Sequence, residues 1–146
     1  MFVAKVIAAA VVLTHGVLGE GIHLLNCSPF GAAGNTRIWY SLVAYCENDA
    51  DCSSLGYVIP SNDRCIVSTS TTPDSFHTWE GGPQNCTFPT GITFGWNIPA
   101  NAQSKPDFSS VGGGWNDFRS FDGYKDNKAN GAGLAFHSCR KIYYYV

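Results

Sequence analysis

The chain has few charged residues, one methionine and, beyond its first 20 residues, no long apolar segment. Charged side chains make up 14% of the 146 residues, with nine lysines and arginines against eleven aspartates and glutamates. A protein that binds a phosphate backbone usually carries a basic stripe, so we expect no nucleic-acid partner. The lack of a second apolar segment predicts a mature chain with no membrane span.

Two motifs that would reveal a chemistry are also missing. There is no C-x-x-C pair, and His23, His77 and His137 stand singly, so closely spaced zinc ligands are excluded. There is no G-x-S-x-G turn to present a nucleophilic serine. The sequence therefore predicts no cofactor and contains no clear catalytic motif.

The first 19 residues have the pattern of a secretory signal peptide. Lys5 supplies the positive charge, residues 6–13 the short apolar region, and residues 17–19 the cleavage site. The apolar region is shorter than the roughly 20 residues that span a bilayer. Cleavage after Gly19 leaves a single secreted domain over residues 20–146, and these 127 residues can enclose one core. We therefore predict an extracellular protein.

Six cysteines remain in the mature chain, an even number on an oxidising route. They are Cys27, Cys46, Cys52, Cys65, Cys86 and Cys139. We predict three disulfides, each adding about 2–4 kcal/mol to the free energy of unfolding. Of the many pairings that six cysteines allow, the spacing favours only a local Cys46–Cys52 ring.

Two sequons are present, beginning at Asn26 and Asn85. Each has a cysteine in its middle position, where disulfide formation competes with glycosylation. The sequence therefore leaves open whether either asparagine is glycosylated. The pair is typical of a eukaryotic secreted glycoprotein.

Sixteen glycines and seven prolines interrupt the chain too often for long helices. Residues 92–98 alternate large apolar with small or polar side chains, which predicts an interior strand with Phe94 and Trp96 buried. The glycine on the opposite face of this strand predicts close packing by another group. Residues 134–146 have a similar β pattern.

Shorter strands are predicted over residues 56–59 and 65–69. Residues 36–46 fit a strand or a helical stripe, and their aromatic content favours the strand. The segments predicted as surface loops are rich in small and polar residues and cover 68–83, 101–114 and 122–133. The predicted fold class is all-β, as a single compact, disulfide-stabilised antiparallel β-sandwich.

Two tryptophans stand beside glycine-rich turns. Trp79 precedes Gly81 and Gly82, and Trp115 follows three consecutive glycines. Exposed aromatic rings on loops commonly bind sugars or proteins, so both residues are candidates for a binding surface. For each ring taken singly, burial in the core is the favoured interpretation.

Four residues offer an alternative catalytic reading. His77, Glu80, Arg119 and His137 could together perform general acid–base cleavage of RNA, with the arginine stabilising the developing charge. Their order resembles that of the small fungal guanyl-preferring ribonucleases, although the spacings differ. This resemblance implies a small secreted hydrolase of ribonuclease type.

Two turns resemble the calcium-binding motif of βγ-crystallin domains, at residues 48–53 and 116–121. The resemblance implies a Greek-key fold and a weak metal site at Asp49, Asp117 and Ser120. Cysteine and phenylalanine replace hydroxyl residues of the motif at positions 52 and 121.

The leader, the six cysteines and the aromatic strands together resemble the small cysteine-rich secreted proteins of fungi. Many members of that class are effectors, toxins, inhibitors or wall-associated proteins. The resemblance implies an extracellular binding protein without catalysis, whose partner is a protein or a glycan. The alternatives are the ribonuclease-like hydrolase and an inhibitor or calcium-binding crystallin-like protein. Convergence of at least three of the four candidate catalytic residues in one concave site would favour the hydrolase.

Overall fold

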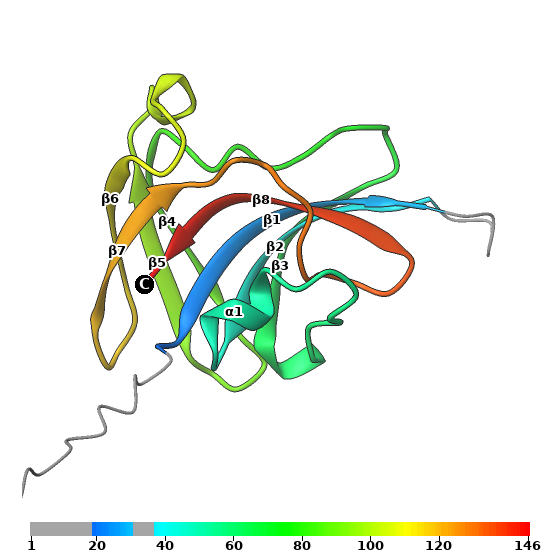
Figure 1. Ribbon diagram of the computed structural model, residues 1–146, viewed down its shortest axis with the longest axis horizontal. Helices are drawn as coiled ribbons and strands as arrows, with labels where there is room; N and C mark the ends of the chain where they lie inside the picture. Colours follow the sequence, from blue (N-terminus) through cyan, green and yellow to red (C-terminus); the bar gives the residue numbers. More distant parts are fainter. Residues whose placement is uncertain (1–18, 31–36) are drawn as a thin grey trace, which may run out of the picture.

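The computed structural model describes residues 19–30 and 37–146, so all but the last residue of the predicted signal peptide lies outside the described residues. Eight strands form one antiparallel sheet (Figure 1). The strands are β1 (Gly21–Pro29), β2 (Trp39–Cys46), β3 (Arg64–Ser70), β4 (Gly82–Thr87), β5 (Thr93–Ile98), β6 (Ser110–Trp115), β7 (Ser120–Lys125) and β8 (His137–Tyr145). Between them lie the short helix α1 (Asp49–Cys52) and the 3₁₀ turns η1 (Ser61–Asp63) and η2 (Ala102–Ser104).

The strand order in space is β3-β2-β1-β8-β7-β6-β5-β4. Each strand pairs with a neighbour in sequence, and β1 also pairs with β8, so the order is that of a meander and not of a Greek key. The two edge strands, β3 and β4, are consecutive in the chain and are joined by the Cys65–Cys86 disulfide. The sheet therefore curls until its edges meet. The prediction of an all-β, antiparallel, disulfide-stabilised fold is confirmed.

The main core fills the inside of this curled sheet and is dominated by aromatic rings. Phe94 is 1% exposed and Trp96 is fully buried, which confirms the predicted interior strand. The Phe94 ring packs against Tyr145 and Phe121 with centroids 5.2 and 5.6 Å apart. A side chain at Gly95 would lie 2.5 Å from the Trp115 ring, which confirms the close packing predicted for that glycine.

A second, smaller core lies on the outer face of the β1–β2–β8 region, beneath α1. Two disulfides are buried in it. Cys27–Cys139 links directly paired residues of β1 and β8. Cys46–Cys52 ties α1 to the end of β2, which confirms the one pairing that the spacing predicted. All six cysteines are thus paired.

Two glycine-containing segments predicted as surface loops are strands over part of their length. The predicted loops 101–114 and 122–133 contain β6 up to Gly114 and the last residues of β7. A Cβ atom at Gly114 would lie 2.5 Å from the Phe94 ring, and one at Gly123 would lie 2.4 Å from the Tyr145 ring. These glycines make room for aromatic rings inside a sheet and do not mark turns.

Other elements also differ from the prediction. Residues 56–59 contribute only an isolated bridge from Val58 to Gly133, and neither β1 nor β4 was predicted. The helical segments of the described residues are short, and none has the length and apolar character needed to cross a membrane.

Candidate functional site

The two closest residues of the predicted catalytic set, His77 and Glu80, line one polar cleft of about 640 Å³. Its floor comes from β1 and β8, and one wall is the segment between β3 and β4, residues 71–81, at the top of the view in Figure 1. The side chains lining this polar cleft are those of Asn26, Ser28, Asp74, Phe76, His77, Thr78, Trp79, Glu80, Gln103, Lys128, Arg140 and Ile142.

Hydrogen bonds to the sheet hold the wall in place. The backbone N–H of His77 donates to Ser41 Oγ at 2.9 Å, and Ser41 Oγ donates to Asn26 Oδ1 at 3.0 Å. Trp79 Nε1 donates to the same Asn26 oxygen at 3.1 Å. Ser41 is fully buried and Trp79 is 2% exposed, so these partly buried bonds fix the wall against the floor.

The bonding of His77 defines which ring nitrogen is free to bind a ligand. Gln84 Nε2 donates to the carbonyl oxygens of Thr78 and Trp79, both at 3.1 Å. Gln84 Oε1 therefore faces His77 Nε2 as an acceptor, and the Nε2 atom carries the hydrogen. The Nδ1 atom of neutral His77 is left as an acceptor. The ring also packs edge-on against Trp79, with centroids 5.0 Å apart.

Glu80 belongs to a chain of hydrogen bonds that leads into the sheet. Its Oε1 atom accepts from the Tyr143 hydroxyl, which accepts in turn from Gln103 Nε2 at 2.7 Å. Burial, followed by the hydrogen bond to Glu80, raises the pKa of Tyr143, so the hydroxyl stays protonated and donates. One carboxylate oxygen of Glu80 is therefore committed to the protein itself.

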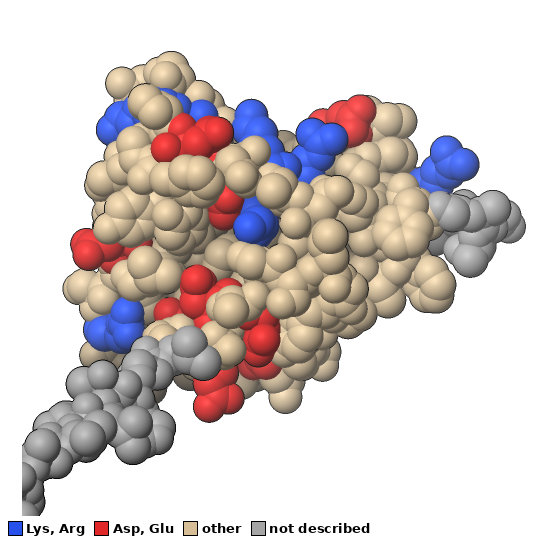
Figure 2. Space-filling model, in the orientation of Figure 1, with Lys and Arg blue, Asp and Glu red and all other residues tan. Residues whose placement is uncertain are grey.

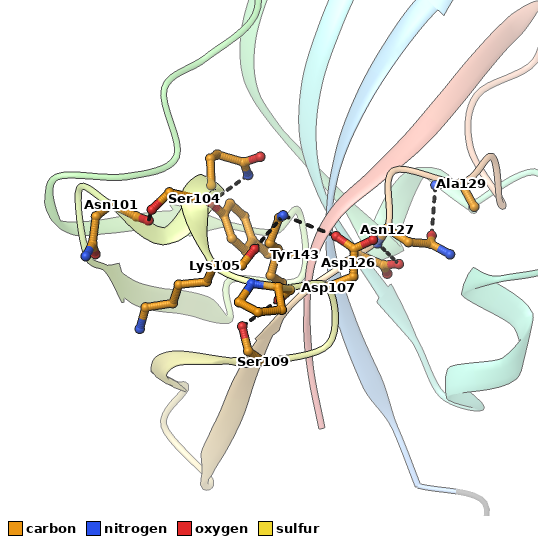
Figure 3. Close-up of polar contacts among 12 residues, drawn as sticks. Asn101, Ser104, Lys105, Asp107, Ser109, Asp126, Asn127, Ala129 and Tyr143 are labelled. Atoms are coloured by element: carbon orange, nitrogen blue, oxygen red, sulfur yellow. Dashed lines mark hydrogen bonds and ion pairs between the residues drawn. The ribbon is translucent and has the colours of Figure 1, made fainter.

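Lys128 and Arg140 bring positive charge to the polar cleft. Among the described residues neither makes an ion pair. Lys128 sits in a tight turn in which Asp126 Oδ1 accepts from the N–H of Asn127 at 2.8 Å and Asn127 Oδ1 accepts from the N–H of Ala129 at 3.0 Å (Figure 3). The turn gives Lys128 a φ of 61°. Such a backbone is unfavourable for a residue with a side chain and is common at binding sites.

Asp74, on the facing wall, has the same unusual backbone, with a φ of 57°. The polar cleft thus presents charges of both signs from residues held in sparsely populated conformations. Its other lining groups include the amide of Asn26 and the hydroxyls of Ser28 and Thr78. This arrangement can hold a polar ligand by several hydrogen bonds at once.

Arg119 and His137 lie outside the polar cleft. Arg119 Nη1 pairs with Glu20 Oε1 at 3.2 Å, and its guanidinium lies 4.2 Å from the centre of the Phe121 ring. The two ring nitrogens of His137 lie 2.8 and 3.0 Å from the carbonyl oxygens of Ala135 and Ile38. The structure therefore brings together two of the four candidate catalytic residues.

Trp79, one of the two candidates for a binding surface, is buried in the core. It is 2% exposed, its ring packs against Trp96 with centroids 5.6 Å apart, and its Nε1 atom is bonded to Asn26. The buried Trp79 ring anchors the wall of the polar cleft in the core. Trp115 is 44% exposed and lies over Gly95 on the outer face, away from the polar cleft.

The two sequons have different surroundings. Asn26 is half-buried in β1, and its Oδ1 atom accepts from both Ser41 and Trp79. A glycan on Asn26 would have to occupy the polar cleft, so the folded protein is poorly suited to glycosylation there. Asn85 is exposed on the edge strand β4, and glycosylation at this residue stays a prediction.

The two crystallin-like turns are closed by their own side chains. Asn48 Oδ1 accepts from the N–H of Ala50 at 3.2 Å, and Asn116 Oδ1 accepts from the N–H of Phe118 at 2.8 Å. Acidic side chains gather around α1 (Figure 2), but Asp49 is bonded to His23 Nε2 at 2.7 Å. Asp117 and Ser120 lie in the separate β6–β7 region. No group of three or more His, Cys, Asp or Glu in the described ranges is arranged to hold a metal ion.

Four important residues of this site were not predicted from the sequence. Gln103, Lys128 and Arg140 line the polar cleft, and Tyr143 holds Glu80. They are distant in sequence from His77, so only the pairing of β1 with β8 and the curl of the sheet bring them together. The single available signal was the β pattern of residues 134–146, which places Arg140 and Ile142 on one face of a strand.

The chain was compared with protein-family models, with curated proteins and with solved structures, and none of them matches. The polar cleft must therefore be interpreted from its own chemistry.

Proposed function

We propose that this chain is a small secreted binding protein that acts outside the cell without catalysis and holds a glycan in the polar cleft. The observation that carries this proposal is the set of unused hydrogen-bonding groups in one rigid hollow. His77 Nδ1 and the second carboxylate oxygen of Glu80 are acceptors, and Lys128 and Arg140 are donors. Sugar hydroxyls both donate and accept, so they match a surface of this mixed kind.

Three features support an extracellular location. The domain contains three disulfides and no free cysteine, a combination typical of oxidising compartments. The predicted signal peptide and the class resemblance to cysteine-rich secreted proteins point the same way.

The geometry favours binding over hydrolysis. General acid–base cleavage of RNA needs two proton-transfer groups on opposite sides of the phosphate and a cation for the developing charge. His77 and Glu80 come from the same short wall segment, and Tyr143 already donates to Glu80. Lys128 and Arg140 can supply the cation, but Arg119 and His137, the other members of the ribonuclease-like set, are bonded elsewhere.

Purified protein is therefore expected not to cleave RNA at a rate that depends on His77, Glu80, Arg119 or His137. Loss of an essential acid or base typically lowers a rate by ~10²–10⁴, so a real activity would be easy to detect. Wild-type and single alanine variants should be incubated with a labelled RNA and the products separated by gel electrophoresis. Degradation by the wild type that disappears in His77→Ala or His137→Ala would replace the binding proposal with the hydrolase.

Binding itself should be measured on a panel of immobilised polysaccharides, with neutral and acidic members. We expect at least one to retain the wild-type protein, and Arg140→Gln to weaken that binding by roughly 10- to 100-fold, because hydrogen bonds from a charged donor are the stronger kind. Arg37→Gln makes the same change at an exposed residue outside the polar cleft, so its binding should equal that of the wild type. The proposal would be contradicted if no polysaccharide retained the protein, or if both variants lost the same polysaccharide affinity.

A further inference from the structure

We infer that the protein has a second ligand site, which takes a small hydrophobic amine. The site, called here the apolar pocket, has a volume of about 290 Å³ and opens at the end of the curled sheet away from the polar cleft. It lies where β1, β3 and β5 begin and β2 and β4 end. These strand ends are near the bottom of the view in Figure 1. It shares no lining residue with the polar cleft, so this inference is independent of the proposed function.

The walls of the apolar pocket are the exposed end of the main core. Ile22, Phe88 and Phe94, which are 2%, 6% and 1% exposed, line it and belong to the same buried cluster. An apolar group placed here leaves water for a surface of close-packed hydrocarbon. Ligand sites in proteins usually start at about 300 Å³, so the apolar pocket suits one ring with a short chain.

The rim of the apolar pocket carries the carboxylates of Glu20 and Asp63. Glu20 is occupied, since Oε1 pairs with Arg119 at 3.2 Å and Oε2 accepts from the Tyr45 hydroxyl at 3.0 Å. Asp63 makes no ion pair with any described residue. Burial raises the pKa of Tyr45 to about 12, with further contributions from the hydrogen bond to Glu20 and from nearby carboxylates that include Asp63. Tyr45 therefore stays neutral at physiological pH. Cleavage after Gly19 would add the α-ammonium group of Glu20 to the rim, so the Asp63 carboxylate itself, and not the net charge of the rim, is the group that would attract a cation.

An exposed aromatic ring stands at the mouth of the apolar pocket. Phe118 lines it and is 76% exposed. The turn that presents it is fixed by Asn116, whose Oδ1 atom accepts from the N–H groups of Phe118 and Arg119 at 2.8 and 3.0 Å. An ammonium group beside Asp63 could use both the carboxylate and the face of an aromatic ring. Apolar walls, an unpaired carboxylate and this ring together select a cation with a hydrophobic body over a neutral or acidic compound.

The inference is tested by titrating isotope-labelled protein with three compounds of similar shape and following the amide NMR signals. The probes are 2-phenylethylamine, 2-phenylethanol and phenylacetate. The amine is expected to shift signals of residues 20–22, 92–94 and 116–118, and to bind about tenfold more tightly than the alcohol. The acid is expected to bind more weakly still.

Two variants separate charge recognition from general loss of structure. Asp63→Asn should reduce the affinity for the amine about tenfold while leaving binding of the alcohol unchanged. Asp74→Asn is the matched control, because it removes the same charge at the rim of the polar cleft, and amine binding should be unaffected. The inference would be overturned if the protein bound the amine and the alcohol with equal affinity, or if both variants lost the same affinity for the amine. It would also be overturned if the amide signals did not shift at roughly 10 mM amine.

Discussion

Replacing Trp96 with alanine is expected to lower the free energy of unfolding by about 3–5 kcal/mol. Trp96 is fully buried, and its ring lies 5.6 Å from that of Trp79 and 6.2 Å from that of Phe94. Its Nε1 atom donates to the carbonyl oxygen of Trp79 at 3.2 Å in a buried position. Truncation would leave a large cavity between the wall of the polar cleft and the core, and the Trp79 carbonyl would keep only its hydrogen bond from Gln84 Nε2. Domains of this size are stable by only about 5–15 kcal/mol, so much of the total would be lost.

Urea unfolding followed by circular dichroism measures this effect, provided that the slope of the free energy against urea is unchanged. Trp115→Ala is the matched control, because this tryptophan is on the adjacent strand β6 and is 44% exposed. Its loss should cost only about 1 kcal/mol. If the two variants had the same stability, Trp96 would not be the core residue described above.

The contribution of each disulfide to the free energy of unfolding is expected to increase with the length of chain that the disulfide encloses. Cys27–Cys139 spans 112 residues, Cys65–Cys86 spans 21 and Cys46–Cys52 spans 6. By loop-closure entropy, replacing each pair with serines should lower the free energy of unfolding by about 5, 3 and 2 kcal/mol respectively. The first loss is comparable with the whole stability of a small domain, so that variant should be largely unfolded at 37 °C.

Thermal and urea unfolding of the three double variants give this order directly. Before these measurements, alkylation of wild-type protein without reduction should add no mass, since all six cysteines are paired. An order in which Cys46–Cys52 contributes most would show that local strain or packing, and not loop length, governs these bridges.

The parts of the fold that could be predicted are those whose signal is local. Residues 92–98 alternate because one face of β5 packs in the core, and the six-residue separation of Cys46 and Cys52 makes a local ring easy to close. The strand over 134–146 likewise carries its own pattern, which β8 confirms.

What could not be predicted depends on contacts between distant segments. Gly114 and Gly123 read as loop residues because the rings that cover them, Phe94 and Tyr145, lie elsewhere in the sequence. Arg140 belongs to the polar cleft only because β8 pairs with β1 beside Asn26. Cys65 in β3 can pair with Cys86 in β4 only after the sheet has curled, and no local pattern in either strand predicts that curl. His77 and Glu80 were found because they are near neighbours in sequence.

The meeting of β3 and β4 has a consequence for self-association. An exposed sheet edge can template the addition of a strand from another molecule, which is a common start of aggregation. Inserting a strand between two edges needs about 9–10 Å between them, whereas the Cα atoms of Cys65 and Cys86 are 6.1 Å apart. At this point the oxidised protein leaves no room for an added strand. The same chain kept in a reducing compartment could open there and expose two free edges, so oxidation of this one bridge also protects the protein against β-aggregation.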